Sequence, residues 1–167
     1  DAWSATATPE GLILAFQGCD TSLVVQVDTA PDWLRFTLRA IRGARPTHVD
    51  LVRIPFGIEG TVGRTLNIAY DDRTAVSVLS ASQQVGCRVQ GRKHRYLAAT
   101  SQDAPGPKLE GASAALIVCP PDDFPAIARH AAHAFGMLTN ETPDGVPVKD
   151  TDAVRGSYYF IGFGEKD

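Results

Sequence analysis

The stretch Ala112–Leu138 constrains the fold more than any other part of the sequence, because it joins the only unbroken apolar run to a clear helix pattern. Ala112–Cys119 (ASAALIVC) predicts a buried strand. Pro120 and Pro121 cannot donate hydrogen bonds to a sheet, and each restricts the residue before it. We therefore expect the strand to end at this pair and the chain to turn.

A helix is predicted directly afterwards, over about residues 122–139. Asp122 or Asp123 is expected to accept hydrogen bonds from the free amides at its N-terminus, and Pro125 is tolerated because it lies in the first turn. Apolar residues then recur every three or four positions, at Phe124, Ile127, Ala128, Ala131, Phe135 and Leu138. This stripe predicts a helix that packs closely on a sheet.

Most of the remaining chain consists of short apolar or alternating segments separated by Gly, Pro, Asn, Asp and Ser, which is typical of strands. These segments are 11–17, 23–28, 33–41, 48–56, 66–70, 75–80, 85–89, 96–99 and 157–164. In 48–56 the alternation puts Arg53 on the face of Val49, and Pro55 indicates an edge or a bulge. The fold class predicted is β-rich α+β: a strongly bent antiparallel sheet or partly closed barrel with one main helix packed on it.

Length and composition predict one globular domain over residues 1–167, with a loop-rich boundary between sub-units near 101–111. No apolar run reaches the 18 or so residues that a membrane helix needs, so we expect no membrane partner. No targeting segment is visible, although a cleaved signal peptide would leave no trace. The three cysteines lack the spacing of a disulfide framework, which favours reduced thiols and a cytoplasmic location.

Charge is distributed unevenly along the chain, although the net charge is only −3. Residues 35–95 contain ten Arg and one Lys against four acidic residues, for a net charge of +7. Residues 1–34 and 96–167 each have a net charge of −5. The sequence is therefore a basic middle region between two acidic flanks.

The basic middle region is the strongest functional signal, and it predicts a surface that binds an anionic partner such as nucleic acid. Arginine and lysine neutralise phosphates, and an aromatic ring can stack on a base. The candidate anion-binding residues are Arg35, Arg39, Arg42, Arg45, Arg88, Arg92, Lys93, Arg95 and Tyr96. The alternative is a solvated exterior whose arginines pair with acids from the two flanks.

An enzyme is the first alternative, namely a small hydrolase or transferase. Its candidate nucleophile is Cys19, in a turn after a strand, and activation of the thiol would need His94 or His130 within hydrogen-bond reach. His130 and His133 lie three residues apart on the predicted helix and could supply two metal ligands. Two ligands do not make a site, so we expect neither a metal nor an organic cofactor.

A second alternative is a structural subunit that self-associates. The aromatic segment Tyr158–Phe163 would pair with a second copy if it formed an edge strand. On balance the sequence favours a non-catalytic binding or assembly module, and it names no ligand.

Overall fold

The computed structural model describes residues 3–90, 95–102, 108–137 and 146–152. The chain divides into two compact units, Asp1–Met137 and Leu138–Asp167. The described part of the second unit contains a short 3₁₀ helix, η1, at Val148–Asp150. All other described elements belong to the first unit, and the prediction of a single domain stays a prediction.

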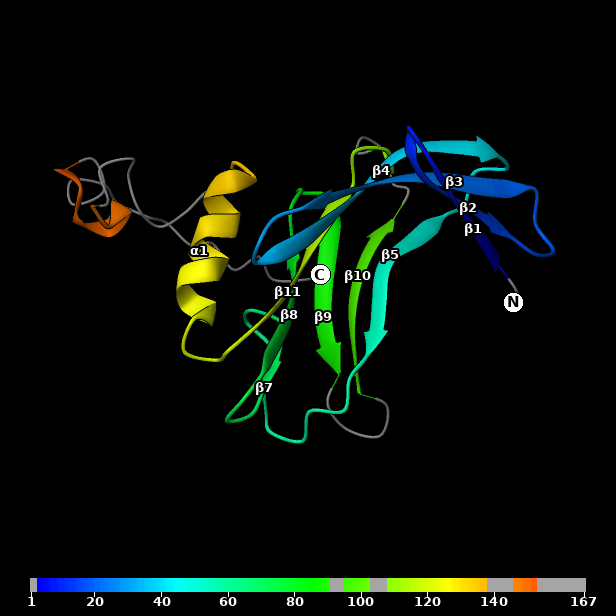
Figure 1. The fold of residues 1–167 in the computed structure, drawn as a ribbon. Coiled ribbons are helices and arrows are strands. Elements are labelled where there is room, and N and C mark those ends of the chain that lie inside the picture. The colour runs from blue at the N-terminus through cyan, green and yellow to red at the C-terminus, as the bar shows by residue number, and fades with distance from the viewer. Residues whose placement is uncertain (1–2, 91–94, 103–107, 138–145, 153–167) are drawn as a thin grey trace, which may run out of the picture. The chain divides into compact units, whose positions relative to one another are not determined.

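Eight strands of the first unit form a large antiparallel sheet (Figure 1). Its order is β1-β2-β3-β4-β11-β8-β7-β6. The strands are β1 Trp3–Thr8, β2 Gly11–Phe16, β3 Thr21–Thr29, β4 Trp33–Gly43, β6 Thr61–Gly63, β7 Ile68–Tyr70, β8 Ala75–Ser80 and β11 Ser113–Cys119. β2 and β3 pair as an antiparallel hairpin, and β11 lies inside the sheet between β4 and β8.

Three strands form a small antiparallel sheet that packs on one face of the large sheet. They are β5 His48–Pro55, β9 Val85–Gln90 and β10 Tyr96–Gln102, in the order β5-β10-β9. Apolar side chains of both sheets meet in one core cluster, which includes Val52, Leu97 and Ala99 from the small sheet and Val76, Val78 and Ala114 from the large sheet. β5 is an edge strand, as the proline at its end predicted.

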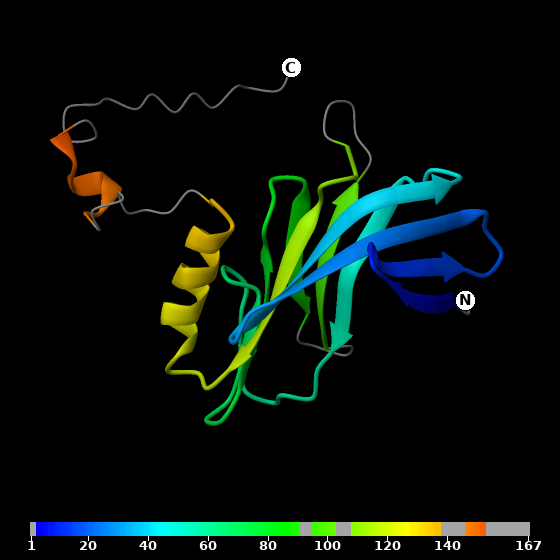
Figure 2. The ribbon, with the colours of Figure 1, turned by 45° about the horizontal axis from the view of Figure 1, so that its top comes forward.

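Helix α1, Phe124–Ala134, packs on the opposite face of the large sheet (Figure 2). Phe124 and Ala131 of the helix contact Ile117 in a core cluster separate from that between the sheets. The Trp33 ring meets the Phe135 ring edge-to-face, with the centroids 4.9 Å apart. The molecule is thus a β-rich α+β protein with bent antiparallel sheets and one packed helix, and the described strands do not close into a barrel.

Several local details differ from the sequence prediction. Asp123 occupies the N-cap of α1, but its side chain makes no capping hydrogen bond, because its own backbone is already helical at φ −83° and ψ −20°. Strands β1 and β6 were not predicted from the sequence. The expected strand 157–164, and with it Tyr158–Phe163, lies outside the described residues.

Gly43, at the end of β4, allows the chain to fold back against the β2–β3 turn. Its φ is +83°, and a side chain there would collide with the backbone oxygen of Asp20. That same oxygen accepts a hydrogen bond from the Ala44 amide. The contact therefore needs a residue without a Cβ atom.

We expect Gly43→Ala to lower the free energy of unfolding by more than about 1 kcal/mol, because the substitution adds both backbone strain and a clash. Urea unfolding followed by circular dichroism measures this. Gly57→Ala is the matched control, since Gly57 has no positive φ and an added Cβ would meet nothing within 4 Å. Equal stability of the two variants would contradict this account of Gly43.

Candidate functional site

The structure separates the described candidate anion-binding residues into two groups, one on or next to the large sheet and the other on the small sheet. The first group comprises Arg35, Arg39, Arg42 and Arg45 and is called the large-sheet arginines. Arg35 donates two hydrogen bonds to Asp28, the shorter 2.7 Å long, and its guanidinium lies 5.4 Å from the centre of the Phe135 ring. Arg39 donates to Gln26 at 2.6 Å.

The other two large-sheet arginines pair with acids from the flanks of the sequence. Arg42 lies 3.0 Å from Glu10, and Arg45 holds Glu110 through two hydrogen bonds of 2.8 and 3.0 Å. Arg45 lowers the pKa of Glu110 below its ordinary value. Three of the four large-sheet arginines therefore form ion pairs with a carboxylate, the arrangement expected of a solvated exterior.

The second group lies on the outer face of the small sheet, where Tyr96 lies between two guanidinium groups. The guanidinium carbon of Arg53 on β5 lies 4.8 Å from the centre of the Tyr96 ring, and that of Arg88 on β9 lies 5.9 Å from it. Arg53 and Arg88 are both exposed and both lie opposite Ala98 of β10 in register. We call Arg53, Arg88, Tyr96 and Ala98 the small-sheet face.

The two arginines of this face differ in their partners. Arg53 lies 3.5 Å from Asp50, which also accepts a hydrogen bond of 2.6 Å from the Thr100 hydroxyl. Arg88 contacts the Tyr96 ring, and no carboxylate of the described residues pairs with it. Arg88 is thus a cation available for a ligand.

Arg53 was absent from the sequence-based candidates, and regular alternation put it on the face of Val49. The structure contradicts that assignment. A bulge interrupts the pairing of β5 with β10 between Ala99 and Thr100, so that Val49 and Val52 are buried while Asp50 and Arg53 are exposed. One extra residue in a strand reverses the faces of all residues beyond it.

The remaining basic candidates are only partly described. The Arg95 side chain donates a hydrogen bond to the Ile58 carbonyl, which ties the start of β10 to the chain beyond β5. Arg92, Lys93 and His94 lie outside the described residues.

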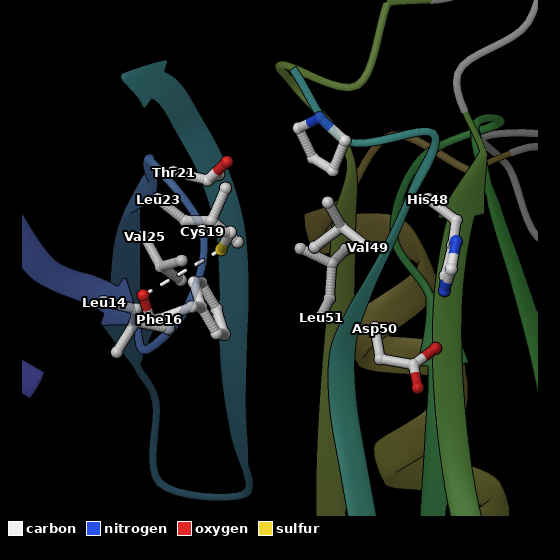
Figure 3. A pocket seen from close by; sticks show the side chains of 11 residues that line it. Leu14, Phe16, Cys19, Thr21, Leu23, Val25, His48, Val49, Asp50 and Leu51 are labelled. Carbon is white, nitrogen blue, oxygen red and sulfur yellow. Dashed lines mark hydrogen bonds between the residues drawn. The ribbon is translucent and has the colours of Figure 1, made fainter. Parts of the chain in front are cut away.

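Cys19 lines an apolar pocket of about 510 Å³ between the β2–β3 hairpin and β5 (Figure 3). Its thiol donates a weak hydrogen bond of 3.9 Å to the Phe16 carbonyl. Figure 3 places Cys19 on one wall and His48 and Asp50 on the other. His48 is thus the histidine that shares a pocket with Cys19, whereas sequence reasoning named His94 or His130, and no hydrogen bond joins the two described side chains.

The two histidines of α1 are both exposed, on the side of the helix away from its apolar stripe. Within the described residues, no group of three or more His, Cys, Asp or Glu side chains could hold a metal ion. His130 and His133 therefore have no third ligand in that part of the chain.

The other two cysteines lie in apolar surroundings, and none of the three forms a disulfide. Burial raises the pKa of Cys87 to about 11, and it also raises that of Cys119. Neither thiol is activated as a nucleophile.

Comparisons with known proteins give no relative: no family model, no curated protein and no solved structure matches the chain. Among the described helices, none is both long enough and apolar enough to cross a membrane.

We expect iodoacetamide at about pH 8 to modify Cys19 alone in the folded protein, since Cys19 is exposed. A pKa of about 11 leaves only about one Cys87 in a thousand ionised at that pH. Mass spectrometry of the labelled peptides measures the pattern, and labelling in urea, where all three thiols react, is the control. Modification of Cys87 before Cys19 would contradict the assignment of their environments.

We expect the ion pair of Asp28 and Arg35 to make stability depend on pH. The Arg35 guanidinium lowers the pKa of Asp28 from its ordinary value of 3.8, so the contribution is present above that value and is lost as the pH falls through the lowered pKa. Asp28→Asn should cost about 1 kcal/mol at neutral pH, and the difference should vanish in acid.

Urea unfolding of wild type and variant at several pH values measures this difference. Glu10→Gln is the control, because the side chains of Glu10 and Arg42 are 67% and 53% exposed and their pairing should contribute little. A difference that stays constant between neutral and acid pH would rule out this ion pair as its source.

Proposed function

We propose that the chain is a non-catalytic binding module that engages an anionic partner through the small-sheet face. The observation that carries the proposal is the pair of guanidinium groups held against one tyrosine ring, of which Arg88 has no carboxylate partner among the described residues. A cation held in place by a ring is ordered before the ligand arrives, which reduces the entropy lost on binding.

The contrast with the large-sheet arginines supports the choice of face. Arg35, Arg42 and Arg45 already pair with carboxylates, so an anionic ligand would have to displace a partner from each. Arg88 needs no such exchange. Of the two sets of candidates, the small sheet is therefore the better site for a phosphate or a sulfate.

The partner that we propose is a polymer, and nucleic acid is the first to test. Few cations are available on this face, so one isolated anionic group would bind weakly, whereas repeated charges along a chain raise the chance of engagement. The cytoplasmic location expected from the three cysteines agrees with such a partner and stays a prediction.

We expect labelled inorganic polyphosphate to bind at low ionic strength and to be released as salt rises, since binding displaces counterions. Arg88→Glu should weaken binding at least about tenfold. Arg42→Glu is the matched control, because it makes the same change of charge on the other sheet and should alter the affinity much less. Fluorescence anisotropy measures both.

Two results would contradict the proposal. Equal losses in the two variants would mean that only overall charge matters. Absence of binding to polyphosphate and to nucleic acid at low salt would make the basic middle region a solvated exterior.

A further inference from the structure

We infer that the small-sheet face binds single-stranded nucleic acid, with a base stacked on the Arg53 guanidinium and a phosphate paired with Arg88. This inference rests on the proposed function and names its ligand. It follows from the shape of the face and from the different partners of the two arginines.

The long side chains of this face converge on the Tyr96 ring. Ala98 is oriented toward the outer face, as Tyr96 two residues before it is, yet its exposed fraction is 0%. A methyl group on a sheet exterior is covered completely only when neighbouring side chains lie over it. Those neighbours are Tyr96 in the same strand and Arg53 and Arg88 in the two adjoining strands.

Planar groups lying against a sheet offer a surface for stacking. A guanidinium group is flat and less strongly hydrated than an ammonium group, and it stacks on aromatic rings and on bases. The side chain of Arg53 is 60% exposed, although its guanidinium contacts the Tyr96 ring. A base can therefore reach the Arg53 guanidinium beside the tyrosine ring.

The two arginines differ because Asp50 forms an ion pair with Arg53 and not with Arg88. The Asp50 carboxylate lies 3.5 Å from Arg53 and offsets part of that charge, while the Arg53 side chain stays 60% exposed. Arg88 keeps its full charge. The arrangement therefore presents a stacking plane beside a cation, which matches a base joined to its phosphate.

The same geometry selects a single strand over a duplex and over a polymer without rings. The bases of a duplex are already stacked on one another and show only their edges in the grooves, where a sheet face cannot reach them. Polyphosphate has charge but no planar group, so it can pair with Arg88 but cannot stack on the Arg53 guanidinium.

The test compares two labelled strands of equal charge, an oligothymidylate of about 12 nucleotides and an abasic strand of the same length. We expect fluorescence anisotropy at low ionic strength to give about tenfold tighter binding of the strand with bases. Arg53→Lys keeps the charge and removes the plane, so it should weaken oligothymidylate binding to about the abasic level. Arg42→Lys is the control and should leave the preference for bases intact.

The outcomes separate this inference from the proposed function. Equal binding of both strands, with loss in Arg88→Glu, would overturn the inference and leave an anion-binding face. Tighter binding of a duplex of equal length would also overturn it. Failure of both strands and of polyphosphate to bind would overturn the inference and the proposed function together.

Discussion

The structure depends on β11 being apolar on both of its faces. Ala114 and Leu116 belong to the cluster between the two sheets, whereas Ile117 and Cys119 belong to the cluster beneath α1. A strand that is apolar on both faces needs another element packed against each face. Burial of its side chains is the main contribution to the free energy that holds both elements in place. The small sheet is thus fixed on one face and the helix on the other, which leaves the outer face of the small sheet to solvent.

The position of the candidate site follows from this layering. The small sheet turns its apolar residues toward the core, so its charged and aromatic residues collect on the outside. The bulge in β5 then brings Arg53 to the same side as Tyr96 and Arg88. Among the large-sheet arginines, Arg42 and Arg45 pair with acids from distant parts of the chain, as Arg45 pairs with Glu110 from 65 residues away.

The sequence predicted the elements whose causes are local. The pair of prolines after Cys119 ends a strand by removing donors, and the stripe from Phe124 to Phe135 follows the helix period, so both could be read without tertiary information. β1 was missed because Trp3–Thr8 has small and polar residues in place of an apolar pattern, and its pairing with β2 defines it. The prediction of the face on which Arg53 lies was wrong, because a bulge depends on how the strand pairs with its neighbour. Which arginines pair internally depends on contacts between remote segments, and no local pattern contains that information.

The edge position of β5 has a consequence for the solution behaviour of the chain. An edge strand leaves backbone donors and acceptors without partners on one side, and another strand can add to it. Asp50 and Arg53 lie on the outer face of this edge strand, and Pro55 at its end has no amide hydrogen to offer. Pairing with a second strand would require desolvation of both charged side chains, and no backbone hydrogen bond could be donated at Pro55. Asp50, Arg53 and Pro55 therefore disfavour the addition of a strand from a second copy at this edge.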